Sequence, residues 1–120
     1  EGDRRDHLAR LSPCLGTDAI DELRDQARVI TASPALLDYV QALLAASRRH
    51  AEIRVGLSPR AGLALLSAAR AWALLSGRNY LLPEDVQALF VAVAAHRLIP
   101  AKGAAREALA RALLAEVAVE

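Results

Sequence analysis

The segment Gly56-Leu57-Ser58-Pro59-Arg60, followed by an apolar run that begins at Leu63, marks the start of the helix around which we expect this chain to fold. Ser58 has the side chain of a helix N-cap, and Pro59 suits the first helical position because no N–H is needed there. Arg60 therefore falls in the first turn, where unpaired amide groups and the helix dipole already make the site positive. A cation in that turn costs roughly a few tenths of a kcal/mol unless an anion lies beside it, so this stretch suggests a phosphate ligand.

This helix is predicted to run from Pro59 to about Ser76 and to end at Gly77, a residue type that favours the position just after a helix. Apolar side chains cover much of its circumference rather than a single stripe, which indicates a central helix that is contacted on several sides. These residues are Leu63, Leu65, Leu66, Ala68, Ala69, Trp72, Ala73 and Leu74.

Two earlier segments also carry helical patterns, in which apolar residues recur on one face. The first predicts a helix from about Asp18 to Arg28, with Thr17 as its N-cap. Ser33-Pro34 opens the second by the same cap-then-proline pattern, and we interpret its basic end as a solvated helix terminus that complements the dipole. The apolar stripe of the first helix consists of Ile20, Leu23 and Ala27. That of the second consists of Leu36, Leu37, Val40, Leu43 and Leu44, and its basic end of Arg48, Arg49 and His50.

Two later segments complete the set of predicted helices. Pro83 begins one whose first turn carries Glu84 and Asp85, the charge sign that the dipole prefers there, and which ends at His96-Arg97. The other is expected from about Ala104 to Ala118. The apolar stripe of the helix that begins at Pro83 consists of Val86, Leu89, Phe90 and Val93, and that of the last helix consists of Leu109, Leu113, Leu114 and Val117.

The connecting segments contain two short extended pieces. Ile53 and Val55 alternate with charged neighbours, and the stretch from Asn79 to Leu82 is also extended. This leads to the hypothesis that the two pieces pair as a minimal two-stranded clip. The start of the chain, Glu1 to Arg10, is charged and aperiodic, which is typical of a linker or a frayed end.

The composition supports an all-α fold and narrows the function. Hydrophobic residues make up 54% of the chain and aromatic residues only 3%, and the abundant alanine and leucine favour helices over strands. We therefore expect a compact helical bundle of about five helices. The net charge of +1 argues against a dedicated nucleic-acid surface, which normally has an excess of basic residues.

Single residue types add three further expectations. Cys14 is the one cysteine of the sequence, which excludes an intrachain disulfide and leaves no metal-ligand spacing. The sequence contains no methionine, so we expect it to be a domain of a longer polypeptide. No apolar run approaches the length that crosses a membrane.

The residues that could carry chemistry do not form a recognisable catalytic set. Glu84 and Asp85 are adjacent in a helix, and His7, His50 and His96 are far apart in the sequence. We interpret His96 as a buried polar anchor rather than a ligand. No glycine-rich phosphate loop is present. The chain is therefore expected to have no catalytic residue and no metal site of its own.

Two interpretations of the role of Arg60 remain open. It is either a surface arginine paired with a nearby carboxylate, or an arginine presented to a polyphosphate that is held mainly by another domain. The small neighbours Ala61 and Gly62 would let a flat ligand or another domain approach, although Gly62 would equally serve helix packing.

Several short motifs follow one another in a fixed order along the chain. They are Tyr39-Val40-Gln41-Ala42-Leu43, Ser47-Arg48-Arg49-His50, Gly56-Leu57-Ser58-Pro59-Arg60-Ala61, Ala68-Ala69-Arg70-Ala71-Trp72-Ala73, Gly77-Arg78-Asn79-Tyr80, Leu82-Pro83-Glu84-Asp85-Val86 and His96-Arg97-Leu98. In this order they resemble the C-terminal lid domain of the MoxR family of AAA+ ATPases, from about Ser12 to Leu98 and more loosely to Val119. The resemblance implies an AAA+ lid fold, with residues 1–16 as a linker from an AAA+ core domain and residues 17–120 as the lid.

The resemblance also implies a nucleotide-binding role. A lid of this family closes over ATP and magnesium bound by the core domain of the same polypeptide. Ser58, Pro59 and Arg60 match the family's nucleotide-binding motif by position. Arg60 matches the sensor-2 arginine, which contacts the γ-phosphate and reports hydrolysis through lid movement. The family's phosphate loop, metal-binding acidic pair, sensor-1 residue and arginine finger have no counterpart here, so this chain alone is not expected to hydrolyse ATP.

The same resemblance implies a wider role in chaperone-like remodelling or metalloenzyme maturation in the cytoplasm. The full-length protein is then expected to form a hexameric ring of subunits and to act with a von Willebrand factor A-type partner. No nucleic-acid partner is expected. Nothing in the residues identifies a client. Two other functions stay open. One is a histone-like DNA-binding domain, which the near-neutral charge disfavours. The other is a helical protein-interaction module that docks a partner through an apolar groove.

Overall fold

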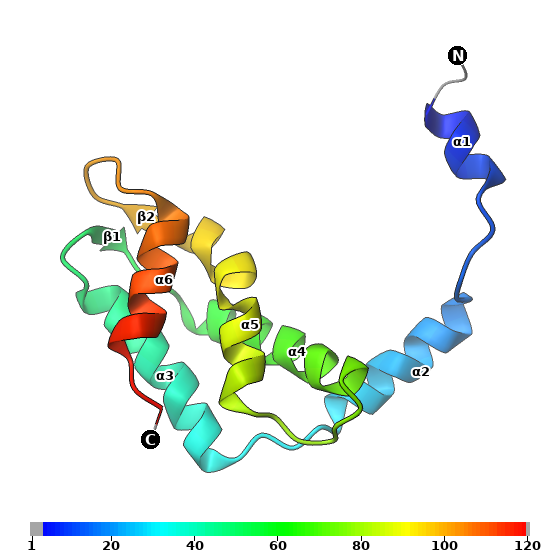
Figure 1. Ribbon diagram of the computed structural model, residues 1–120, viewed down its shortest axis with the longest axis horizontal. Helices are drawn as coiled ribbons and strands as arrows, with labels where there is room; N and C mark the ends of the chain where they lie inside the picture. Colours follow the sequence, from blue (N-terminus) through cyan, green and yellow to red (C-terminus); the bar gives the residue numbers. More distant parts are fainter. Residues whose placement is uncertain (1–3, 120) are drawn as a thin grey trace.

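The computed structural model describes residues 4–119 and is built almost entirely of helices (Figure 1). The elements are α1 (Arg4–Arg10), α2 (Thr17–Arg28), α3 (Pro34–Arg49), β1 (Ile53–Val55), α4 (Pro59–Leu75), α5 (Pro83–Ala94), the 3₁₀ turn η1 (Ala95–Arg97), β2 (Ile99–Pro100) and α6 (Arg106–Glu116). The predicted helical bundle with a minimal two-stranded sheet is confirmed. No helix among the described residues is long and apolar enough to cross a bilayer.

The core lies between α3, α4, α5 and α6, with α5 packed along α4 and α6 packed against both α5 and α3 (Figure 1). The face of α4 turned towards the core carries small residues, which allow the neighbouring helices to approach closely. Leu44 of α3 packs directly on Gly62, where an added Cβ would lie 2.8 Å from the Leu44 Cδ1 atom. The side chains that fill this core with almost no exposed surface are Leu43, Leu57, Leu65, Val86, Phe90, Leu98 and Leu113.

Several apolar residues of α4 are not covered by the rest of the described chain. The exposed fractions of Leu63, Trp72 and Leu75 are 69%, 45% and 79%, so the apolar circumference expected for this helix is only partly buried. α2 lies near the C-terminal half of α4 and forms an open groove with it, yet α2 itself has no buried residue. α4 is therefore central to the bundle without being enclosed.

The helix starts read from the sequence are confirmed at α3 and α4. The Ser33 Oγ atom accepts a hydrogen bond of 3.1 Å from the N–H of Leu36, and the Ser58 Oγ atom accepts one of 3.3 Å from the N–H of Ala61. Gly77 follows α4 with a φ of 79°, the left-handed conformation that glycine adopts without strain. Thr17 is different, because it already belongs to α2 and Gly16 takes the cap position without a side-chain bond.

The predicted partner of β1 is wrong. β1 pairs antiparallel with β2, so that Ile53 lies opposite Pro100 and Val55 opposite Ile99. The stretch 79–82 is already engaged elsewhere: the N–H of Thr31 donates to the Asn79 carbonyl at 3.1 Å, and the N–H of Leu81 donates to the Thr31 carbonyl at 2.9 Å. After α5, the turn η1 brings the following residues back beside β1, which supplies the strand that does pair with it.

The two ends of the chain also differ from expectation. Arg4–Arg10 is helical rather than irregular, because arginine, leucine and alanine favour a helix, but α1 has no buried residue and lies apart from the bundle (Figure 1). Residues 1–3 of the expected linker lie outside the described part of the chain. At the other end, α6 is shorter than predicted and spans Arg106–Glu116.

Gly56 should be sensitive to substitution because the loop before α4 passes directly against the last turn of α3. A Cβ at this position would lie 2.7 Å from the carbonyl carbon and oxygen of Ser47 and 2.8 Å from the backbone nitrogen of Arg48. We expect Gly56→Ala to lower the free energy of unfolding by about 1–3 kcal/mol, since backbone atoms have to shift. Chemical denaturation of the two proteins measures this difference.

Gly16→Ala is the matched control, because a Cβ there meets nothing within 4 Å. Its free energy of unfolding should fall by no more than about 1 kcal/mol, since the only expected cost is that alanine caps the start of α2 less well than glycine does. Equal effects of the two substitutions would show that the close approach at Gly56 does not limit stability.

Candidate functional site

Ser58, Pro59 and Arg60 form the exposed N-terminal end of α4. Within residues 4–119, the side chain of Arg60 makes no hydrogen bond and no ion pair. The interpretation of Arg60 as a surface arginine paired with a nearby carboxylate therefore finds no support in the described structure. A guanidinium with all of its donors unused is left at the positive end of a helix.

The backbone donors at this end of α4 are largely satisfied. Pro59 has no N–H, the N–H of Ala61 donates to the Ser58 Oγ atom, and the N–H of Gly62 donates to the Ser58 carbonyl oxygen at 3.3 Å. An anion would therefore be recognised chiefly by Arg60, through its guanidinium and its own N–H. A single arginine does not enclose a phosphate, so the other ligands have to come from elsewhere.

Ala61 and Gly62 are buried and do not form a platform for a flat ligand. Leu44 covers Gly62, and Ala61 is only 3% exposed. Of the two roles considered for these small residues, the structure supports helix packing. The site is consequently a single cationic side chain on a rigidly packed helix end.

The histidines do not contribute to this site. His96 is exposed, so its predicted role as a buried polar anchor is wrong. His50 accepts a hydrogen bond of 3.1 Å at Nδ1 from the N–H of Glu52, which accounts for it as a local turn residue. Among the described residues, no group of histidine, cysteine, aspartate and glutamate side chains is arranged to hold a metal ion.

Residues 45–117 match the family model of the AAA lid domain. The chain belongs to the AAA lid domain family. The match begins inside α3, so it does not test the boundary predicted between residues 16 and 17. The family is the one that the order of the short motifs indicates.

Several known proteins resemble this lid. It is 29% identical to the uncharacterized protein YeaC of Bacillus subtilis over 117 residues, which are 93% of this chain and 37% of that protein. It is 44% identical to protein MoxR of Paracoccus denitrificans over 98 residues, 69% of this chain and 29% of that protein. It is 38% identical over 74 residues to chaperone MoxR1 of Mycobacterium tuberculosis, 54% of this chain and 20% of that protein.

A solved structure supports the same assignment. The crystal structure of a protein from Cytophaga hutchinsonii assigned as an ATPase matches with a TM-score of 0.81 and 26% identity, over 86% of this chain and 36% of that one. Together with the MoxR relatives, it identifies the chain as the AAA lid of a MoxR-like ATPase. The chain spans between 20% and 37% of the lengths of these relatives.

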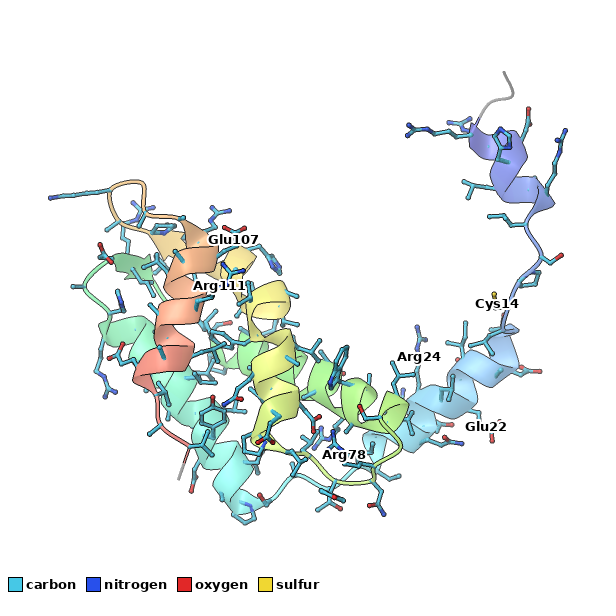
Figure 2. All side chains as sticks on the ribbon, in the orientation of Figure 1. Cys14, Glu22, Arg24, Arg78, Glu107 and Arg111 are labelled. Atoms are coloured by element: carbon cyan, nitrogen blue, oxygen red, sulfur yellow. The ribbon has the colours of Figure 1, made fainter. Side chains whose placement is uncertain are left out.

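The lid contains an ion pair with a buried carboxylate, which the sequence patterns missed. Asp85 at the start of α5 is 1% exposed, and its carboxylate accepts hydrogen bonds from both terminal nitrogens of Arg78, one of them at 2.8 Å. The N–H of Leu82 donates to the same carboxylate at 2.7 Å. The Arg78 guanidinium also donates to the Tyr80 carbonyl and lies 5.7 Å from the centre of the Tyr80 ring. The pair thus fastens the α4–α5 loop, which carries Arg78 (Figure 2), onto the first turn of α5.

The electrostatics of this pair favour its charged form. The hydrogen bonds from Arg78 lower the pKa of Asp85, with a smaller contribution from the Leu82 N–H, and they prevail over the burial that would raise it. The pKa of Arg78 is raised by the same hydrogen bonds. α4 spans Pro59–Leu75, about 25 Å of helix, so this pair lies far from Arg60 and is structural.

The Arg78–Asp85 pair predicts a pH dependence of stability. Because the folded pKa of Asp85 is lowered, the contribution of the pair is complete above about pH 4, the ordinary pKa of an unfolded aspartate, and is lost as the pH falls through the lower folded value. Asp85→Asn should lower the free energy of unfolding at neutral pH by about 1–3 kcal/mol and should flatten the loss below pH 4. Urea denaturation between neutral and acidic pH measures both effects.

Asp25→Asn is the control for this prediction. Asp25 pairs with Arg28 at 2.9 Å on the surface, where both side chains are more than 70% exposed. We expect this substitution to change stability by less than about 1 kcal/mol. An acid profile of Asp85→Asn that parallels the wild type would contradict the assigned role of the carboxylate.

Proposed function

We propose that this lid closes over ATP and magnesium held by an AAA+ core domain of the same polypeptide, with Arg60 as the sensor-2 residue on the γ-phosphate. The observation that carries the proposal is the state of Arg60: an exposed cation without a partner in residues 4–119, in the first turn of a capped helix. Phosphate oxygens are the ligands that a helix N-terminus and a guanidinium both favour. Ser58 and Pro59 set the helix start from which Arg60 reaches the nucleotide.

The chemistry of Arg60 suits a sensor. A guanidinium is charged at every working pH and binds phosphate through directed N–H donors, so its contact depends on the charge and position of the γ-phosphate. Hydrolysis removes that partner and leaves a cation in an unfavourable turn. Since α4 is packed into the core, movement of Arg60 carries the bundle with it, which converts loss of the phosphate into lid movement.

The wider role that we propose is chaperone-like remodelling, including metalloenzyme maturation, by a hexameric ring in the cytoplasm, with a von Willebrand factor A-type partner. The name of the Mycobacterium tuberculosis relative, chaperone MoxR1, supports the remodelling class. Hydrolysis itself is assigned in this proposal to the core domain and neighbouring subunits, because the sequence contains no counterpart of the family's phosphate loop.

A second candidate function is a helical interaction module. The specific observation in its favour is the open groove between α2 and α4, which combines apolar side chains with arginines. Its lining includes Ile20, Leu23, Arg24, Ala71, Leu74 and Leu75. The histone-like alternative has no such support, since the net charge of the chain is only +1.

The sensor role is tested by Arg60→Ala in the full-length polypeptide. We expect kcat for ATP hydrolysis to fall by on the order of 10²-fold, the usual effect of removing one charge-stabilising donor in an active site. The fold should be intact, and thermal stability of the lid should be equal or slightly higher, because a cation is removed from a helix N-terminus. Steady-state ATPase assays and thermal denaturation measure the two results.

Arg106→Ala is the matched control, since Arg106 is also an exposed arginine in the first turn of a helix, α6. Its hydrolysis rate should stay within about twofold of the wild type. If Arg60→Ala hydrolyses ATP as fast as Arg106→Ala does, the sensor role is excluded.

A further inference from the structure

The last turn of α3 holds the backbone of Leu57 from both sides. The N–H of Leu57 donates to the Ser47 Oγ atom at 2.8 Å, and the Leu57 carbonyl accepts a hydrogen bond of 3.1 Å from Arg48 Nε. Ser47 has no exposed surface, and its hydroxyl donates in turn to the Leu44 carbonyl at 2.6 Å. We call Ser47, Arg48 and Leu57 the Leu57 clamp.

Leu57 is held by burial and by close backbone packing in addition to the two hydrogen bonds of the clamp. The side chain of Leu57 is 1% exposed, and the preceding Gly56 passes so close to Ser47 that only a residue without a Cβ fits. Leu57 is therefore fixed to α3 by its N–H and its carbonyl group, and its side chain is buried in the core. A loop residue with all three groups engaged has little conformational freedom left to lose.

The two residues between Leu57 and Arg60 also have little conformational freedom. Ser58 is held by its cap hydrogen bond, and the ring of Pro59 fixes its own φ. The Cα atom of Arg60 is consequently placed with respect to the end of α3 and not only with respect to α4. This matters because a cation in the first turn disfavours the helix end on which it sits, and the clamp opposes the fraying that would relieve it.

We propose that Ser47 and Arg48 are positioning residues for Arg60, which hold the start of α4 so that the guanidinium meets the phosphate at a fixed place. The inference rests on the proposed sensor role of Arg60. Arg48 and Arg49 are both exposed, as the interpretation of a solvated basic helix end expects, and Arg48 in addition donates to the Leu57 carbonyl. The side chain of Arg49 makes no hydrogen bond or ion pair within residues 4–119, so it is the natural control.

The test compares Arg48→Met with Arg48→Gln in the full-length polypeptide. Both remove the charge, but Gln keeps an N–H donor at the position along the side chain where Arg has Nε, whereas Met has none. Arg49→Met and Arg49→Gln are the matched pair in the same helix turn. Ser47→Ala leaves a buried N–H without an acceptor and destabilises the whole lid, so the arginine series carries the test.

Two readouts are measured for each variant. Hydrogen exchange without nucleotide reports the amides of Leu57, Ala61 and Gly62, and ATPase kinetics report kcat and KM. Arg48→Met should speed exchange at these amides and lower kcat by about two- to tenfold, with a smaller change in KM. Arg48→Gln should stay within about twofold of the wild type, and both Arg49 variants should change neither readout.

The double variant Arg48→Met with Arg60→Ala separates positioning from a purely structural effect. If Arg48 acts through Arg60, the double variant has the kcat of Arg60→Ala alone. Unchanged exchange in Arg48→Met, or a further fall in kcat when it is added to Arg60→Ala, overturns the inference. Failure of the proposed function has a different signature, since Arg60→Ala then hydrolyses ATP at the wild-type rate whatever the exchange result.

Discussion

Close packing of α4 against α3 and α5 is the constraint on which the rest of this lid depends. The face of α4 turned to the core is built from Ala61, Gly62, Ala69 and Ala73, all buried, so that Leu44 of α3 lies directly on the helix backbone. Such close contacts allow little sliding, because protein interiors are packed at crystal-like density. The end of α4 that carries Arg60 is thereby fixed in space.

The lid uses its arginines in contrasting ways. Arg78 is paired with the buried Asp85 and fastens the start of α5, where it completes a closed network of donors and acceptors. Arg48 uses one nitrogen to hold the Leu57 carbonyl. Arg60 has no partner in residues 4–119 and is placed where the helix dipole opposes it. In the proposed function this guanidinium supplies one half of an anion site, on a helix end that α3 holds in place.

Local patterns in the sequence predicted most of the helices, and non-local contacts account for the errors. Ser33, Ser58, Pro59 and Gly77 act within a few residues of themselves, so their roles can be read directly. The partner of β1 could not be read in this way, because a two-residue strand has almost no pattern and is chosen by where η1 returns the chain.

The errors at single side chains have the same origin. His96 was predicted to be buried but is exposed, because it lies in η1 two residues after Ala94, the last buried position of α5. Asp85 was explained by the helix dipole alone, whereas its burial depends on Arg78 folding over it from the preceding loop. Arg48 and Arg49 are both exposed and are indistinguishable in sequence, and only the hydrogen bond from Arg48 to the Leu57 carbonyl separates them.

By itself, the sequence determined the all-α class, the capped starts of α3 and α4, the family motifs and the position of Arg60 in an unfavourable turn. These follow from side-chain preferences that act over one or two helix turns. The tertiary structure alone decided that Arg60 has no partner within residues 4–119, that Asp85 is buried beneath Arg78, and that α3 holds the residue before the cap of α4. Each of these depends on groups that meet only when the chain folds back on itself, since a hydrogen bond requires a distance that sequence spacing does not specify.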